Sequence, residues 1–327
     1  MNEFRWGILG TGGIASAFVK DLEMAEGHSV VAVGSRSQQK ASEFARSIPG
    51  ATAYGSYEDL VCDNDVDAIY VSTPHPFHKE HTLLALHASK PVLCEKPFAI
   101  SASESEEMID AALINKVALL EAMWTRYLPH IAQVRKILSS GVLGKIYSVE
   151  ADHGQRLADR NIPRLVDPEL AGGALLDLGI YPISFAHLIL GAPTKITSRA
   201  VMTDRGVDAQ TSAIFDYADG AQAVITTNMI TRTPCRALVS GLLARLEIES
   251  VFYNPTSMRV ITSDGEITEY PHSYQGHGLR EQAIEMARVV RSGQLESPLM
   301  PWSETVAVMQ SLDEIRRQIG LSYPFEN

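Results

Sequence analysis

The sequence predicts an α/β domain built on a doubly wound parallel sheet, followed by an α+β domain with an open, mostly antiparallel sheet. As far as residue 122, short apolar runs alternate with amphipathic segments, a rhythm typical of strands and helices in a parallel sheet. Beyond that point strand-like runs follow one another, with hairpin signals such as Asp219-Gly220 between them. A chain of 327 residues is long enough for two cores. We therefore expect domains at 1–122 and 123–327.

A glycine-rich turn follows the first expected strand, at 5–9, and leads into a helix that ends near residue 26. The turn reads Gly10, Thr11, Gly12, Gly13, Ile14 and Ala15. This is the G-x-G-x-x-A pattern of dinucleotide-binding domains, in the strand–turn–helix context that the pattern requires. Gly10 permits the tight turn, and Gly12 lets the backbone approach a pyrophosphate at the helix N-terminus. The residues from Gly10 to Ile14 are therefore predicted to bind a dinucleotide in a Rossmann-type domain.

The tip of the second expected strand, at 29–34, indicates which dinucleotide the domain binds. In sites that prefer NAD, an acidic residue about 20 positions after the glycines binds the ribose 2′-hydroxyl. Here the strand ends at Ser35, Arg36 and Ser37, with Lys40 close behind and no acid at the tip. An arginine suits a 2′-phosphate, so Ser35, Arg36 and Lys40 favour NADP over NAD. The alternative is that Arg36 is a solvated loop residue.

Two further strand tips carry polar residues that we expect near the nicotinamide end of the cofactor. The strand at 66–72 ends in a set that we assign to cofactor binding: Ser72, Thr73, Pro74, His75 and His78. The next apolar run, at 90–94, leads into Glu95, Lys96 and Pro97. A lysine there lies at the crevice beyond the strand tips, where open α/β sheets bind ligands. The alternatives are that His78 is only a polar residue at a helix start and that Lys96 is a surface lysine.

The remaining candidate residues follow the first domain. Trp124 and Arg126 come directly after its last expected strand, at 117–121, and are candidates for a substrate pocket; Trp124 suits a domain-interface core equally well. A helix over 172–190 begins at two glycines and carries Asp177 and Tyr181. Because these two are four residues apart, they lie on one face of the helix.

Composition excludes several classes of function. The net charge of −11 without a basic block argues against nucleic acid or an anionic membrane as partner. The three cysteines, Cys62, Cys94 and Cys235, are unclustered, which predicts reduced thiols in a cytoplasmic protein and no metal site. The N-terminus has no signal-peptide pattern, and we expect no apolar run near the ~20 residues that span a bilayer.

In the combination of its glycine turn, Glu95-Lys96-Pro97 and the segment from Gly172 to Tyr181, the sequence resembles the Gfo/Idh/MocA oxidoreductases over nearly its whole length. The resemblance implies hydride transfer to or from NAD or NADP. Most members of this family have His where this chain has Tyr181. Tyr there, with Trp124 and Arg126, is most similar to the branch of dimeric dihydrodiol dehydrogenases and D-xylose dehydrogenases. That branch uses NADP and acts on vicinal diols or on the anomeric hydroxyl of sugars.

The chemistry of the residues agrees with this resemblance. A hydroxyl that is oxidised by hydride loss must also lose a proton, so the site needs a base. Free tyrosine titrates near ~10, and a neighbouring cation lowers that pKa. We therefore expect Tyr181 to act as general acid/base, Lys96 to hold the substrate oxygen and favour the tyrosinate, and Asp177 to orient the substrate or Lys96. The alternative is that Asp177 is only a carboxylate at a helix N-terminus and that Tyr181 is only a half-buried aromatic residue.

Two other functions are compatible with the same fold, because fold does not decide function. One is an NADP-binding regulator without turnover, and the other is a lyase or glycosidase that uses NAD transiently. We also expect a homodimer or homotetramer formed through the antiparallel sheet, since one sheet face of the second domain is predicted to be exposed.

Overall fold

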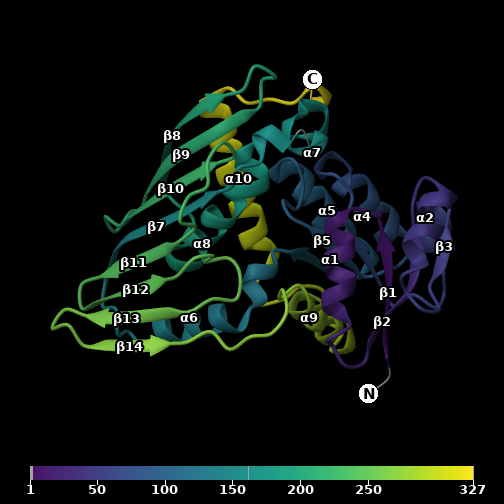
Figure 1. Ribbon diagram of the computed structural model, residues 1–327, viewed down its shortest axis with the longest axis horizontal. Coiled ribbons are helices and arrows are strands. Elements are labelled where there is room, and N and C mark those ends of the chain that lie inside the picture. Colours follow the sequence, from purple (N-terminus) through teal and green to yellow (C-terminus); the bar gives the residue numbers. More distant parts are fainter. Residues whose placement is uncertain (1–2, 161, 327) are drawn as a thin grey trace. The chain divides into compact units, whose positions relative to one another are not determined.

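The computed structural model describes residues 3–160 and 162–326, and the chain divides into two compact units (Figure 1). Unit 1 comprises Met1–Tyr127 and Gly276–Val306, and unit 2 comprises Leu128–Gln275 and Ala307–Asn327. The division after Tyr127 lies close to the predicted boundary at 122/123. The return of Gly276–Val306 to unit 1 was not predicted from the sequence.

Unit 1 is built on a six-stranded parallel sheet with the order β3-β2-β1-β4-β5-β6, which confirms the doubly wound architecture. Its strands are β1 (Phe4–Leu9), β2 (His28–Gly34), β3 (Thr52–Tyr54), β4 (Ala68–Val71), β5 (Val92–Glu95) and β6 (Leu119–Ala122). Its helices are α1 (Gly13–Leu22), α2 (Gln38–Ala45), α3 (Tyr57–Val61), α4 (His78–His87), α5 (Ala102–Asn115), α9 (Arg280–Arg291) and the start of α10 (Trp302–Ile319). The strand order reverses between β1 and β4, so the crevice for a ligand is expected at the carboxyl ends of these two strands.

Strand β4 shows why its sequence is apolar throughout. Tyr70 points to one face of the sheet, where its ring stacks on Phe18 of α1 at a centroid distance of 4.0 Å. Ile69 and Val71 point to the other face and join the core formed with α3, α4 and α5. Both faces of the strand are buried, as expected for a parallel sheet with helices on both sides.

A buried carboxylate holds the returning segment in unit 1. Asp21, at the end of α1, is only 2% exposed and accepts hydrogen bonds from the backbone N–H groups of His277, Gly278 and Arg280. These N–H groups lie at the N-terminal end of α9, where a negative charge is favourable. Asp21 therefore fixes α9 against α1, although the two are more than 250 residues apart in sequence.

Unit 2 is built on an eight-stranded sheet with the order β14-β13-β12-β11-β7-β10-β9-β8. Its strands are β7 (Ile146–Gly154), β8 (Lys195–Met202), β9 (Asp208–Asp216), β10 (Gln222–Asn228), β11 (Ala237–Gly241), β12 (Ala244–Ile248), β13 (Met258–Thr262) and β14 (Ile267–Tyr270). Its helices are α6 (Pro129–Ser139), α7 (Pro163–Val166), α8 (Ile180–Leu190) and the part of α10 from Ala307 onward. All neighbouring pairs are antiparallel except β7 and β10, which confirms the mostly antiparallel prediction.

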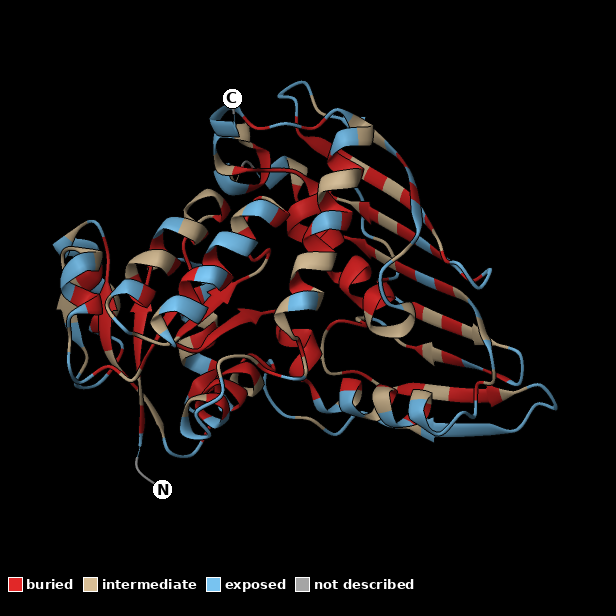
Figure 2. Cartoon of the chain, turned by 180° about the vertical axis from the view of Figure 1, so that it is seen from behind, coloured by how far each residue is buried: buried red, intermediate tan, exposed pale blue. Residues whose placement is uncertain are grey.

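Helices cover one face of this sheet. On that face His187 of α8 hydrogen-bonds the Ser311 hydroxyl of α10 at 2.9 Å, and Gln318 of α10 accepts the backbone N–H of Ser198 on β8 at 2.8 Å. Buried and exposed residues alternate along the strands (Figure 2). The outward-facing positions include Ile214 and Val224, which lie opposite one another on β9 and β10 and are each about 40% exposed.

The glycine-rich segment before α8 folds more tightly than the single helix predicted over 172–190. Gly173 has a φ of +122°, and a Cβ there would lie 2.3 Å from Asp208 Oδ1, so the position requires glycine. Asp208 in turn accepts the backbone N–H of Leu175 at 2.9 Å. A π-helical turn over Leu175–Gly179 follows, and it leads into α8.

The stretch Pro168–Leu190 departs from one sequence expectation. It is long and apolar enough to cross a membrane by length and composition, with a mean hydropathy of 1.5, although no run near ~20 residues was expected. Most of it is buried inside unit 2, with 78% of the window enclosed by protein. Burial of this kind is typical of the core helix of a globular unit.

Candidate active site

The glycine turn after β1 is shaped for an anionic ligand. Gly10 has a φ of +110°, and an added Cβ would lie 3.1 Å from the Ser72 carbonyl oxygen at the tip of β4. In contrast, a Cβ added at Gly12 or Gly13 would meet no atom within 4 Å apart from its chain neighbours and the backbone of its own helix. Gly12 is the N-cap of α1, so the N–H groups of the first helical turn lack intrahelical partners. The backbone thus has both the donors and the room that a pyrophosphate needs.

Positive charge gathers at the tip of β2. The Arg36 guanidinium is exposed and lies 5.8 Å from the Phe77 ring centroid, and in the part of the chain that the structure describes it has no carboxylate in ion-pair range. Ser37 caps α2 by accepting the backbone N–H of Lys40 at 3.4 Å, which keeps Lys40 on the first turn. Ser35 is buried beside them. These side chains suit a 2′-phosphate, because a guanidinium binds phosphate oxygens through two parallel hydrogen bonds.

His78 joins the loops that follow β4 and β5. The ring is fully buried, with Nδ1 at 2.8 Å from the Pro97 carbonyl oxygen and Nε2 at 2.9 Å from the Thr73 carbonyl oxygen. Burial lowers the pKa of His78 to about 4, although both carbonyls favour the charged form. A neutral imidazole has one N–H, so it can donate to only one of these two carbonyl oxygens. The ring is packed between the loop that holds Thr73 and the loop that holds Pro97. A part for His78 in cofactor binding stays a prediction, and the geometry favours an indirect one.

Glu95 points into unit 1. Its carboxylate accepts a hydrogen bond from the Tyr70 hydroxyl and, at 3.2 Å, another from the backbone N–H of Lys96. Glu95 is buried, whereas Lys96 is partly exposed at the start of the loop. The carboxylate thus anchors the backbone that presents the Lys96 side chain.

The two residues assigned to the substrate pocket in unit 1 are both buried. Arg126 is 1% exposed and donates to Glu304 Oε1 at 2.6 Å. The Trp124 ring lies 5.0 Å from the ring of His277, which arrives with the segment that Asp21 holds. Their roles toward a substrate remain predictions. His277 was not found from the sequence, because only the return of residues 276–306 to unit 1 brings it there.

In unit 2, Asp177 lies in the π-helical turn and Tyr181 in the first turn of α8, so their place on one face of a single helix stays a prediction. Asp177 is almost buried, and its Oδ1 accepts a hydrogen bond from the Arg164 guanidinium at 2.8 Å. Sequence reasoning missed Arg164, because the contact joins α7 to the π-helical turn and follows no local spacing. The ion pair fixes the carboxylate on one side of the helix start.

Tyr181 belongs to a cluster of three aromatic rings. Its ring centroid lies 5.2 Å from that of His153 and 4.6 Å from that of Tyr253, and the rings of His153 and Tyr253 are 4.1 Å apart. All three side chains are less than 9% exposed. His153 lies near the end of β7 and Tyr253 in the segment between β12 and β13. Residues of β7 alternate between the two faces of the sheet, and His153 has an inward-facing position. This alternation could have identified His153 from the sequence.

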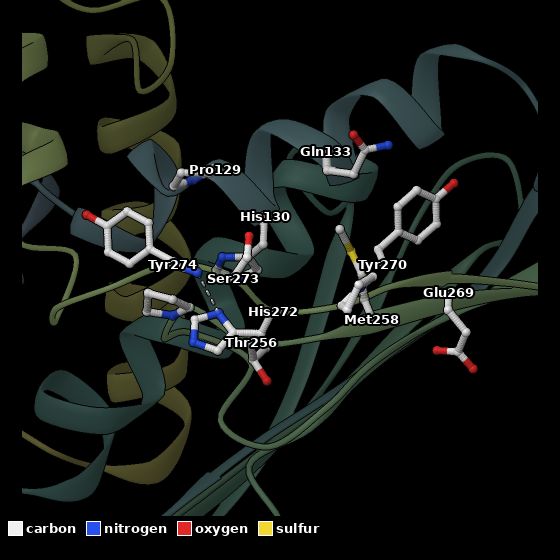
Figure 3. Close-up of a pocket in the computed structure, with 12 residues that line it drawn as sticks. Pro129, His130, Gln133, Thr256, Met258, Glu269, Tyr270, His272, Ser273 and Tyr274 are labelled. Atoms are coloured by element: carbon white, nitrogen blue, oxygen red, sulfur yellow. Dashed lines mark hydrogen bonds between the residues drawn. The ribbon is translucent and has the colours of Figure 1, made fainter.

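Two hollows of unit 2 lie away from these residues. A hollow of about 300 Å³ is lined by α6, β13, β14 and residues 271–274 (Figure 3), and another of about 470 Å³ lies on the uncovered face of the sheet. Neither is lined by a predicted site residue. Within residues 3–160 and 162–326, no three His, Cys, Asp or Glu side chains are placed to hold a metal ion.

Comparison with known proteins shows the family to which this chain belongs. Residues 4–122 match the oxidoreductase family with an NAD-binding Rossmann fold, and residues 131–267 match the Gfo/Idh/MocA C-terminal domain. The chain belongs to the Gfo/Idh/MocA family of oxidoreductases, as its motifs indicated.

Individual relatives match along nearly the whole chain. D-xylose 1-dehydrogenase (NADP(+)) of Hypocrea jecorina is 35% identical, over 98% of this chain and 93% of that protein. Trans-1,2-dihydrobenzene-1,2-diol dehydrogenase of Mus musculus is 36% identical, over 98% of each. Among solved structures, KijD10, a 3-ketoreductase from Actinomadura kijaniata in complex with NADP and TDP-benzene, is 28% identical over 97% of this chain and 98% of that one, with a TM-score of 0.85.

Arg36→Ala tests the cofactor assignment. Because the guanidinium is expected to bind the 2′-phosphate, the variant should bind NADP at least tenfold more weakly, a loss of about 1.4 kcal/mol, and should bind NAD nearly as before. Fluorescence titration of both nucleotides measures this, with the exposed Arg317→Ala as control. A wild-type protein that binds NAD more tightly than NADP would contradict the assignment.

Proposed function

We propose that this protein is an NADP-dependent dehydrogenase that oxidises a CH–OH group of a sugar or of a vicinal diol, or reduces the corresponding carbonyl. The observation that carries the proposal is the placement of Tyr181 one turn after Asp177, packed in a ring cluster, in a chain that also has the dinucleotide turn and Lys96. The names of the relatives support the substrate class, since they act on D-xylose and on a dihydrodiol.

The proposed roles follow from the chemistry of each group. NADP⁺, when bound, accepts the hydride that leaves the hydroxyl-bearing carbon. Tyr181 Oη, as the tyrosinate, takes the hydroxyl proton, so that a carbonyl forms as the C–H and O–H bonds break. The Lys96 ammonium stabilises the negative charge that develops on the substrate oxygen. Asp177, held by Arg164, accepts a hydrogen bond from a neighbouring substrate hydroxyl and orients it.

A substrate panel tests this function directly. Purified protein with NADP⁺ is mixed with pentoses, hexoses and trans-diols, and the absorbance of reduced nicotinamide is followed. Turnover of at least one of these classes is expected. NADP binding without turnover of any substrate would instead support a regulator, and a tightly retained NAD would support a lyase or glycosidase.

Lys96→Met removes the charge and keeps a similar side-chain length. The kcat should fall by at least a hundredfold, because the developing oxyanion loses its cation, while NADP binding by fluorescence quenching persists. Lys136→Met, an exposed lysine on α6, is the matched control and should behave as wild type. Near-normal kcat in Lys96→Met would remove this lysine from the mechanism.

Tyr181→Phe separates proton transfer from packing. The ring and its contacts stay, so the melting temperature should change little, whereas kcat should fall by ~10²–10⁴-fold because the acid/base group is lost. Oxidation should rise with pH through one ionisation in wild type, and this limb should flatten in the variant. Tyr217→Phe is the matched control, since the buried Tyr217 hydroxyl has no hydrogen-bond partner among the described residues. A Phe variant that keeps its rate and its pH limb would move the proton transfer to another group.

We further propose that two copies associate through the uncovered face of the unit 2 sheet, in the cytoplasm, where the three cysteines stay thiols. Exposed Ile214 and Val224 supply apolar surface on that face. Val224→Asp should convert a dimer into a monomer near 35.7 kDa in light scattering, because a charge would be buried. Val142→Asp, outside the sheet, is the control. A monomeric wild type would contradict this interface.

A further inference from the structure

Gln155 connects two rings of the cluster that surrounds Tyr181, although no sequence motif contains it. It follows the last residue of β7, and its side chain is partly exposed. The amide nitrogen lies 2.9 Å from His153 Nε2 and 3.0 Å from the Tyr253 hydroxyl oxygen. Its backbone N–H donates to the Asn228 carbonyl oxygen at 2.9 Å, so the main chain is held as well.

The tautomer of His153 follows from its other nitrogen. Nδ1 lies 3.1 Å from the Leu178 carbonyl oxygen, and a carbonyl can only accept, so Nδ1 carries the hydrogen. In an α-helix the Leu178 carbonyl would receive the N–H of residue 182, but Pro182 has none. His153 supplies a donor at this position. Its Nε2 is then, in the neutral ring, a lone-pair acceptor.

This tautomer decides how the Gln155 amide is oriented. The –NH₂ group must face His153 Nε2, because the reversed orientation would set Oε1 against a lone pair. The second amide hydrogen is donated to the Tyr253 hydroxyl oxygen. Because both amide hydrogens are donated, the orientation of the amide plane, and with it the direction of Oε1, is fixed. Oε1 itself accepts no hydrogen bond from the described residues. The result is a fixed acceptor beside the Tyr181 ring cluster.

We propose that Gln155 is a specificity-determining residue whose Oε1 accepts a hydrogen bond from a substrate hydroxyl other than the one that is oxidised. This inference rests on the proposed function and names its substrate class: polyhydroxylated compounds such as pentoses and hexoses, in preference to a hydrocarbon ring with two vicinal hydroxyls. A vicinal diol has one hydroxyl besides the one that is oxidised, and that hydroxyl is assigned to Asp177, whereas a sugar has further hydroxyls to donate. We therefore expect Gln155 Oε1, which needs a hydrogen-bond donor, to distinguish sugars from vicinal diols.

Gln155→Met keeps the length of the side chain and removes both amide atoms. Its kcat/KM for D-xylose should fall about three- to tenfold, mainly through KM, as expected for the loss of one hydrogen bond of about 0.5–1.5 kcal/mol. Its kcat/KM for trans-cyclohexane-1,2-diol should change less than twofold. Gln222→Met, an exposed glutamine on β10 of the same sheet, is the matched control and should change neither value. In wild type, kcat/KM should be higher for D-xylose than for the diol.

Equal losses for both substrates, or a wild type that prefers the diol, would overturn the proposal and leave Gln155 as a support of the ring cluster. Gln155→Asn covers the case in which the Met variant does not fold, because it keeps the amide and withdraws Oε1 by one methylene. It should lose preference for D-xylose in the same way.

Failure of the proposed function is measured separately. D-xylose is titrated by calorimetry into the NADP⁺ complexes of wild type and of Gln155→Met. If neither substrate is turned over, the proposed function fails, and a Kd for D-xylose that is at least threefold weaker in the variant still supports Gln155 as a sugar contact. An unchanged Kd, or no binding by wild type, overturns the inference.

Discussion

Unit 1 depends on the close approach of β1 and β4 at their carboxyl ends. The Ser72 N–H and hydroxyl both donate to the Leu9 carbonyl oxygen, at 2.9 and 3.1 Å, and Gly10 is packed so tightly against Ser72 that a side chain would meet its carbonyl. This contact lies where the strand order reverses. The open side of the glycine turn, at Gly12 and Gly13, is therefore directed away from the core. The positions of Arg36 and Lys96 follow, because each lies on a loop that continues from a strand of this sheet, and His78 begins α4 shortly after β4.

Unit 2 uses a different device to place its reactive group. At the start of the helix that carries Tyr181, side chains add to the backbone hydrogen bonds. Asp208 accepts the Leu175 N–H, and His153 Nδ1 donates to the Leu178 carbonyl, which Pro182 cannot serve. Burial raises the pKa of Asp208 to about 6. Side chains from strands thus supplement the helical hydrogen bonds in the turn that precedes Tyr181. A tyrosine supported in this way has little rotational freedom, which suits proton transfer to a defined atom.

The sequence predicted those parts of the protein that follow from local spacing. The glycine turn, the strand tips and the pair Asp177 and Tyr181 occur at fixed intervals along the chain, so motif and periodicity reveal them. Arg164, Gln155 and Tyr253 were missed, because each reaches the site through tertiary contacts that no interval encodes. The segment Gly276–Val306 was assigned to the second domain from its place in the chain, but contacts such as those with Asp21 and Arg126 hold it in unit 1. The assigned roles of the site residues toward cofactor and substrate remain predictions.

The carboxylate of Asp21 has a consequence for how the chain folds. Its backbone donors lie about 256 residues downstream, beyond every strand of unit 2. During synthesis α1 is complete long before these donors exist, so unit 1 cannot bury Asp21 with its partners until residues 277–280 have been made. Contacts of such high sequence separation form slowly, because a long loop must close first. The N-terminal nucleotide domain therefore cannot be completed before most of unit 2 has been synthesised, and unit 2 in turn waits for its own last segment, Ala307–Asn327.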